Sequence, residues 1–170
     1  MKNIVLVGFM GSGKSTVAKL LAKTLDIDYV NTDSIIEAQE GISVNEIFNR
    51  HGEAYFRKRE RAVIIDVSER NSSVIDTGGG VVINSENVED LKRTGLVFCL
   101  NASPEEIYRR TKAHAHRPLL NVDDPIAEID RLLKERRVFY DKAEYQIDTD
   151  GKSAEEIVRK IADLYKLNGK

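Results

Sequence analysis

Short apolar runs along the chain alternate with longer segments in which apolar residues recur every three or four positions. The short runs are rich in branched side chains and predict strands, whereas the longer segments predict amphipathic helices. Because such alternation is typical of a parallel sheet covered by helices, we predict an α/β fold built as a three-layer sandwich. The expected strands are Ile4–Val7, Asp28–Asn31, Ser73–Asp76, Leu96–Leu100 and Tyr145–Asp148.

Each of the clearest helical segments carries one apolar face. Ser103 and Ser153 each stand three residues before a glutamate, a pattern that predicts the start of a helix. The apolar faces consist of Val17, Leu20, Leu21 and Leu25 in the first helix, of Ile126, Ile129, Leu132 and Leu133 in a later one, and of Ile157, Ile161 and Leu164 in the last.

Two segments depart from the alternation of strand and helix. Residues 34–67 carry two or three helical patterns without a strand between them, and they include the basic run 57–61. Residues 112–124 contain His, Pro and Asn residues and resemble an exposed loop of a length that usually serves a function, so they are a candidate lid. A chain of 170 residues without a linker or internal repeat is expected to form one domain over 1–170.

The charged residues are nearly balanced, with 26 Lys and Arg against 28 Asp and Glu and a net charge of −2. This balance argues against bulk attraction to nucleic acid or to an anionic membrane. The single cysteine, Cys99, lies in an apolar run and cannot form an internal disulfide, which fits a reducing compartment. We therefore expect a cytoplasmic protein without nucleic-acid or membrane partners.

The segment Gly8–Ser15 matches the P-loop pattern and lies between an apolar strand and an amphipathic helix. Its glycines let backbone N–H groups point at phosphate oxygens, and the helix adds its positive N-terminal end. Lys14 can reach the β- and γ-phosphates, and the Ser15 hydroxyl can bind the magnesium ion that bridges them. An ordinary glycine-rich turn would require neither side chain. A dinucleotide site is rejected because it would need a glycine where the chain has Thr16.

Acidic residues follow two of the expected strands, at the edge where ligands of open α/β sheets bind. Asp33 can accept the proton of an acceptor hydroxyl or hold a metal through water, although it can equally cap a helix that begins near Ile35. Asp76 stands where P-loop enzymes keep an acidic residue that organises magnesium. The glycines Gly78–Gly80 allow a ligand to approach the backbone, whereas a tight turn explains one glycine better than three.

Several arginines are candidate anion ligands. A guanidinium offers two parallel donors, so arginines from separate helices can clamp an anionic substrate, and Arg57 and Arg136 stand out among them only through the family resemblance given below. Arg117, in the candidate lid, can stabilise the charge that develops during transfer. Basic helix surfaces are usually only solvated, and the pattern alone leaves open which arginines act. His114 and His116 lack neighbouring ligands and are interpreted as loop residues rather than a zinc site.

Six motifs, in order and spacing across nearly the whole chain, resemble those of the shikimate kinase family of P-loop enzymes, whose fold is similar to that of nucleoside monophosphate kinases. Each motif alone is modest evidence, but six in register are specific. The motifs are Gly11-Ser12-Gly13-Lys14-Ser15-Thr16, Thr32-Asp33-x-x-Ile36-Glu37, Gly52-Glu53-x-x-Phe56-Arg57-x-x-Glu60, Gly78-Gly79-Gly80, Arg117-Pro118-Leu119-Leu120 and Arg136-x-x-x-Tyr140.

The resemblance implies a five-stranded parallel sheet with a lid at about 112–124 and a substrate-binding helical insertion at about 34–67. It implies transfer of the γ-phosphoryl group of MgATP to the 3-hydroxyl of shikimate, a step of aromatic amino acid biosynthesis, with one Mg²⁺ and a monomeric enzyme. By resemblance, Lys14, Asp33 and Arg117 are catalytic, and Ser15 is the metal ligand. The implied ATP-binding residues are Gly11, Ser12, Gly13, Lys14, Ser15, Thr16, Arg110 and Arg117, and the implied shikimate-binding residues are Asp33, Arg57, Glu60, Gly78, Gly79, Gly80 and Arg136.

The chain also departs from the family pattern. The family usually has Asp-x-Asp where this chain has Asn31-Thr32-Asp33, which replaces one carboxylate by a neutral amide. Asp76 stands where many members have a small or hydroxyl residue, and we hypothesise that it compensates. Phe139 precedes Tyr140 near the position of a frequent proline, and Ala154 replaces a residue that often contacts adenine. These last two changes concern nucleotide affinity rather than the reaction.

Two alternatives stay open at this point. Another small-molecule or nucleoside monophosphate kinase would share the P-loop and lid but phosphorylate a different acceptor. A nucleotide-dependent binding module would bind ATP and transfer nothing, although Asp33, Arg57 and Arg136 argue against it. ADP formation in the presence and absence of shikimate separates the three functions.

Overall fold

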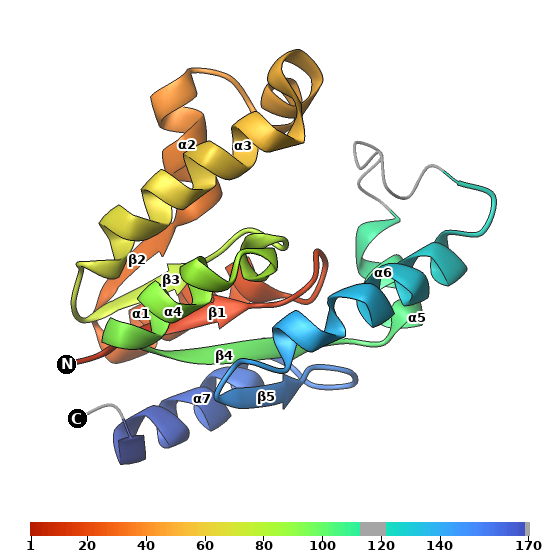
Figure 1. Ribbon diagram of the computed structural model, residues 1–170. Helices are drawn as coiled ribbons and strands as arrows, with labels where there is room; N and C mark the ends of the chain where they lie inside the picture. The colour runs from red at the N-terminus through yellow and green to blue at the C-terminus, as the bar shows by residue number, and fades with distance from the viewer. Residues whose placement is uncertain (113–121, 169–170) are drawn as a thin grey trace.

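Five parallel strands form a single sheet in the order β2-β3-β1-β4-β5 (Figure 1). The computed structural model describes residues 1–112 and 122–168. The order places β1 at the centre, so the loop that follows β1 opens between the neighbouring strands β3 and β4. The strands are β1 (Asn3–Val7), β2 (Asp28–Asn31), β3 (Ser73–Asp76), β4 (Gly95–Asn101) and β5 (Tyr145–Asp148).

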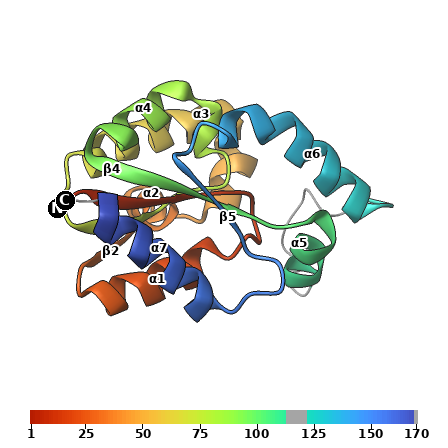
Figure 2. The same ribbon diagram turned by 90° about the horizontal axis from the view of Figure 1, so that it is seen from below.

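Helices cover both faces of the sheet, which gives the three layers seen in Figure 2. On one face α1 packs beside α7, and on the other face α3 packs beside α4. A further pair, α5 and α6, packs together near the carboxyl ends of the strands (Figure 1). The helices are α1 (Lys14–Leu25), α2 (Thr32–Glu40), α3 (Val44–Ser68), α4 (Ser85–Thr94), α5 (Pro104–Thr111), α6 (Pro125–Tyr140) and α7 (Ala154–Asn168), with a short 3₁₀ turn η1 (Val81–Ile83).

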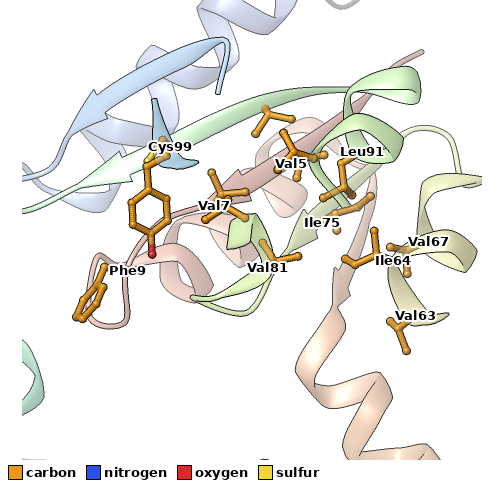
Figure 3. Close-up of a cluster of buried hydrophobic side chains, with 14 of the residues drawn as sticks. Val5, Val7, Phe9, Val63, Ile64, Val67, Ile75, Val81, Leu91 and Cys99 are labelled. Carbon is orange, nitrogen blue, oxygen red and sulfur yellow. The ribbon is translucent and has the colours of Figure 1, made fainter. Parts of the chain in front are cut away.

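The two faces of the sheet bury two separate hydrophobic clusters. Alternate residues of β1 point to opposite faces, so Val5 and Val7 enter one cluster while Ile4 and Leu6 enter the other. Figure 3 shows the first cluster, in which the side chains of β1 meet those of α3 and α4. All four of these β1 side chains are almost completely buried, which explains why the strand appears in the sequence as a continuous apolar run.

The predicted α/β sandwich, the five strands and the capped helix starts are confirmed. Three strands have the predicted bounds, β1 begins one residue earlier, and β4 extends one residue further at each end. Ser103 and Ser153 accept hydrogen bonds from the backbone N–H groups of Glu106 and Glu156, as expected for helix caps. Asn3 joins β1 although it is polar and fully buried, because its amide donates to the carbonyl oxygen of Arg70 (2.7 Å) and accepts from Ser73 N (3.1 Å).

The segment 34–67 is helical, as its pattern predicts. It is occupied by α2 and α3, and α3 has a break at Gly52, whose φ of 81° and ψ of 172° lie outside the helical region. Most of the candidate lid lies outside the described residues, including Arg117, His114 and His116. In the part of the chain that the structure describes, no helix has both the length and the apolar character needed to cross a membrane.

Candidate active site

The P-loop joins the central strand β1 to α1. Gly8, Gly11 and Gly13 have φ values of +145°, +74° and +94°, which side-chain-bearing residues rarely adopt. The Lys14 ammonium lies inside the loop and donates to the carbonyl oxygens of Gly8 (2.7 Å) and Phe9 (3.2 Å). The backbone therefore wraps a buried cation at the positive end of a helix, which is the arrangement that binds phosphate groups.

A buried hydroxyl in the same loop supports this interpretation. Ser12 is 1% exposed, and its Oγ has no hydrogen-bond partner among the described residues. Because an unpaired buried hydroxyl is unfavourable, a polar ligand in the loop would stabilise the protein. Ser15 and Thr16 lie exposed in the first turn of α1, where they can reach such a ligand.

The C-terminal end of α5 packs onto the P-loop. The Arg110 guanidinium donates to the carbonyl oxygen of Gly11 (3.2 Å) and to Thr149 Oγ1 (3.1 Å), and it also forms an ion pair with Glu106 (2.7 Å). A Cβ added at Gly11 would lie only 2.6 Å from a methyl group of Thr111, so this contact requires glycine. Arg110 thus connects the P-loop to α5 and to the segment after β5.

The glycine turn, Gly78–Gly80, lies between the P-loop and the helical insertion. A Cβ added at Gly79 would lie 3.3 Å from the backbone nitrogen of Met10, so the turn approaches the P-loop backbone closely. The N–H of Gly78 donates to Thr32 Oγ1 (3.3 Å), which ties the turn to the start of α2. The three consecutive glycines therefore form a compact junction between elements that are distant in the sequence.

Two carboxylates border Gly78, one from α2 and one from α3. A Cβ placed at Gly78 would lie 2.8 Å from Asp33 Oδ1 and 3.2 Å from Glu60 Oε1. Both oxygens are buried and have no hydrogen-bond partner in the described part of the chain. Glu60 is only 1% exposed, and its other oxygen accepts from Arg57 at 2.8 Å. Two unpaired carboxylate oxygens beside a glycine form a site suited to the hydroxyl groups of a ligand.

Two arginines and a tyrosine border the other end of the glycine turn. The Arg57 guanidinium occupies the space that a side chain at Gly80 would fill. The Tyr140 hydroxyl, at the end of α6, donates to the carbonyl oxygen of Gly79 at 2.7 Å. The Arg136 guanidinium lies 5.4 Å from the ring centroid of Phe9 in the P-loop. Arg57 of α3 thus contacts the glycine turn directly, and Arg136 of α6 lies over the neighbouring P-loop.

The electrostatics of the site follow from burial beside cations. Burial raises the pKa of Asp33; Asp76 and Glu37 raise it further, while Lys14 and Arg57 lower it. The pKa of Glu60 is also raised, chiefly by burial and against the opposing effect of Arg57. Burial raises the pKa of Tyr140 to about 12, although Arg136 and Arg57 lower it. Tyr140 therefore acts as a neutral hydrogen-bond donor.

The alternative in which Asp33 caps a helix is wrong. The helix α2 begins at Thr32, and its cap is Asn31, whose Oδ1 accepts from Ser34 N at 2.8 Å. Asp33 is thereby left in the first turn with an unpaired oxygen that faces Gly78. Because Asn31 accepts the hydrogen bond that caps α2, the Asp33 carboxylate keeps an oxygen that can accept a hydrogen bond from a ligand.

Most of the candidate residues come together, and the structure adds others that the sequence analysis did not assign. Lys14, Asp33, Arg57, Glu60 and the glycine turn are mutually close through the contacts above. Tyr140 was noted only as part of a motif, and its bond to Gly79 depends on packing of α6 that no local signal predicts. Tyr29 is a second addition, since it donates to Asp76 Oδ2 at 3.0 Å. The alternation of Tyr29 and Asn31 along β2 could have indicated that they share a face.

The fold and the site define a P-loop kinase with a fold like that of nucleoside monophosphate kinases. The family model described as "Shikimate kinase" matches residues 10–166, and the chain belongs to the shikimate kinase family.

Curated relatives and solved structures agree with this assignment. The chain is 47% identical to a shikimate kinase of Caldanaerobacter subterraneus subsp. tengcongensis, over 100% of both chains. It is 46% identical to a shikimate kinase of Thermodesulfovibrio yellowstonii, over 100% of this chain and 99% of the relative. A solved shikimate kinase from Acinetobacter baumannii in complex with shikimate superposes with a TM-score of 0.93 at 37% identity, covering 99% of this chain and 94% of that one.

Proposed function

We propose that the protein transfers the γ-phosphoryl group of ATP to the 3-hydroxyl of shikimate and releases shikimate 3-phosphate and ADP. The observation that carries this proposal is the glycine turn, where the backbone of the P-loop meets the unpaired oxygens of Asp33 and Glu60. A phosphate donor held by Lys14 and a hydroxyl acceptor held by Asp33 would share one small site. Such proximity is the main source of catalysis in phosphoryl transfer.

Asp33 is the residue that would handle the proton. As the 3-hydroxyl oxygen forms its bond to the γ-phosphorus, the bond from that phosphorus to the β–γ bridging oxygen breaks, and the hydroxyl proton passes to the Asp33 carboxylate. Burial raises the pKa of Asp33, so its carboxylate is a stronger base than an exposed aspartate. Lys14 would neutralise the charge on the transferring phosphoryl group and on the leaving ADP.

Arg57 and Arg136 would bind the carboxylate of shikimate. They come from α3 and α6, and both lie near the Tyr140 hydroxyl that bonds to Gly79. The Arg57 guanidinium is already oriented by Glu60 at 2.8 Å, and its side chain is 27% exposed, so it can receive a further anion. Because Glu60 holds one guanidinium edge, this pair would set the distance between the substrate's carboxylate and the base Asp33.

Magnesium fits the site as an ion held mainly by phosphate oxygens and water. The described residues contain no group of three or more His, Cys, Asp or Glu side chains that could hold a metal by themselves. Mg²⁺ typically uses one or two protein ligands and keeps several waters, and the exposed Ser15 at the start of α1 offers one such ligand. When bound, with Ser15 as its ligand from the protein, the ion would neutralise charge on the phosphate groups.

The decisive measurement is ADP release with MgATP in the presence and absence of shikimate. Shikimate-dependent release, together with detection of shikimate 3-phosphate, would establish the reaction. Asp33→Asn should then lower kcat by roughly a hundredfold or more while ATP still binds. Asp148→Asn, an exposed aspartate at the end of β5, is the matched control and should be unaffected. ADP release that does not depend on shikimate, or no release at all, would contradict the proposed function.

The proposal extends to the assembly state and to the helical insertion. We propose that the protein acts as a monomer, and light scattering of the active protein would test this. The insertion, which contributes Glu60 and Arg57 through α3, would serve as the shikimate-binding element.

A further inference from the structure

Asp76 is a buried carboxylate that is held on one oxygen only. It is the last residue of β3 and is 1% exposed. Its Oδ2 accepts from Asn31 Nδ2 at 2.7 Å and from the Tyr29 hydroxyl at 3.0 Å. Its Oδ1 accepts no hydrogen bond from the described residues. One oxygen of this carboxylate is thus held by two neutral donors, and the other is left for a further polar ligand.

The position of Asp76 links it to the P-loop. Asn31 and Asp76 are direct partners in the parallel ladder between β2 and β3, and Leu6 of the central strand is the partner of Asp76 on its other side. Burial raises the pKa of the Tyr29 phenol, and Asp76 raises it further. Hydrogen bonds with Asn31 and Ser15 lower it. Asp76 also raises the pKa of Asp33. Tyr29 therefore lies between the Asp76 carboxylate, to which it donates at 3.0 Å, and Ser15 at the start of α1.

Asn31 cannot supply this charge, because its side chain is a neutral amide, and both ends of that amide are already in use. Its Oδ1 caps α2 by accepting from Ser34 N at 2.8 Å, and its Nδ2 donates to Asp76. The pair is therefore complementary: a neutral donor on β2 orients an anion on β3. Tyr29, which contacts Asp76 Oδ2 and lies near Ser15, adds a second neutral donor.

We propose that Asp76 supplies the carboxylate that orients the water shell of the magnesium ion at the P-loop, with Asn31 and Tyr29 holding Oδ2 so that Oδ1 serves the metal's water. This inference rests on the proposed binding of a magnesium nucleotide, but not on shikimate as the acceptor. A water-mediated carboxylate fits magnesium, which keeps most of its waters when it binds to proteins. Residues that orient metal ligands typically change metal affinity by about 10- to 100-fold when they are lost.

The test is a calorimetric titration of ADP into the protein at several magnesium concentrations, without shikimate. Asp76→Asn should reduce the magnesium-dependent gain in ADP affinity by about tenfold while ADP binding without magnesium stays unchanged. Asp148→Asn removes the same charge from the exposed end of β5 and should leave both quantities unchanged. An unchanged magnesium gain in folded Asp76→Asn would overturn the proposal and leave Asp76 a structural role only.

An exchange of the two partners sharpens the test. Asn31→Asp alone places two carboxylates opposite each other and removes a donor, so it should weaken the magnesium effect. The double variant N31D/D76N restores one carboxylate and one amide across the same ladder position, and it should recover most of the magnesium gain. If the magnesium-dependent gain in ADP affinity of the double variant does not exceed that of Asp76→Asn, the carboxylate cannot be exchanged between positions 31 and 76, which would contradict the proposal.

A third variant applies if Asp76→Asn does not fold, as judged by thermal unfolding. Tyr29→Phe removes only one bond to Oδ2 and should reduce the magnesium gain by about two- to fivefold. No reduction in that variant would count against the proposal. Loss of ADP binding with and without magnesium would contradict the nucleotide site itself, and so it is distinguishable from failure of the role of Asp76.

Discussion

The hydroxyl of Tyr140 donates a 2.7 Å hydrogen bond to the carbonyl oxygen of Gly79, so the last residue of α6 anchors the middle of the glycine turn. Tyr140 is 5% exposed, and its neighbours include Arg136 on the same helix and Arg57 from α3. The bond thereby couples the position of α6 to that of the turn on which the candidate substrate residues converge. The geometry of the site depends on this contact between segments 61 residues apart.

Replacement of Tyr140 by Phe should weaken shikimate binding more than ATP binding. The change leaves the Gly79 carbonyl without its donor and should destabilise the protein by about 1–3 kcal/mol. We expect KM for shikimate to rise several-fold with little change in KM for ATP, as measured by steady-state kinetics. Tyr145→Phe is the control, because the Tyr145 ring stacks on Phe98 and its hydroxyl makes no hydrogen bond in the described part of the chain. Equal changes in KM for shikimate and in KM for ATP would contradict a role of Tyr140 in shikimate binding.

Replacement of Gly80 by Ala should displace the Arg57 guanidinium without unfolding the protein. Gly80 has φ −102° and ψ 5°, which alanine tolerates, so the new methyl group meets only the end of a flexible side chain. We expect a stability change below about 1 kcal/mol, measured by urea unfolding, together with a rise in KM for shikimate. An unchanged KM for shikimate would contradict the role of Arg57, and a large loss of stability would show that the methyl group displaces more than a flexible side chain.

Arg110 should affect nucleotide binding, whereas its neighbour Arg109 should not. Both arginines pair with Glu106, but only Arg110 also donates to Gly11 in the P-loop and to Thr149. Loss of charge-assisted hydrogen bonds typically costs about 1.5–3 kcal/mol, so Arg110→Ala should weaken ATP binding by about tenfold or more. Arg109, whose side chain is 66% exposed, provides the matched control in Arg109→Ala. Calorimetric titration with ATP measures the affinity of both variants. Equal ATP affinities of Arg110→Ala and Arg109→Ala would refute the role of Arg110.

The Glu60 carboxyl should make a pH-dependent contribution to stability. Burial raises its pKa in the folded protein, so the folded state binds this proton more tightly than the unfolded state does. Its contribution is fully present below the unfolded pKa and is lost as pH rises through the folded pKa. Glu60→Gln removes this dependence. The free energy of unfolding of the wild type, relative to Glu60→Gln, should therefore fall as the pH rises above the ordinary glutamate pKa of about 4.3 and through the raised folded pKa, with a slope of at most about 1.4 kcal/mol per pH unit. Urea unfolding at several pH values measures this difference, and a rising difference would contradict it.

Local features explain why the elements were predictable from the sequence. Branched apolar runs, helical periodicity and serine caps act over a few residues, so the strands and the capped helix starts of α5 and α7 followed directly from the sequence. The exceptions are polar residues with distant partners. Asn3 extends β1 because its amide is satisfied by Arg70 and Ser73, about 70 positions away along the chain.

The P-loop and the placement of Lys14 and Ser15 at its end were determined by the sequence alone, because the loop is continuous and its glycines act on their own backbone. Only the tertiary structure decided which carboxylates face the glycine turn, that Asn31 rather than Asp33 caps α2, and that Asn31 pairs with Asp76. These relationships join β2, β3, α3 and α6 across long stretches of chain. They depend on strand order and helix packing, which no local pattern of residues specifies.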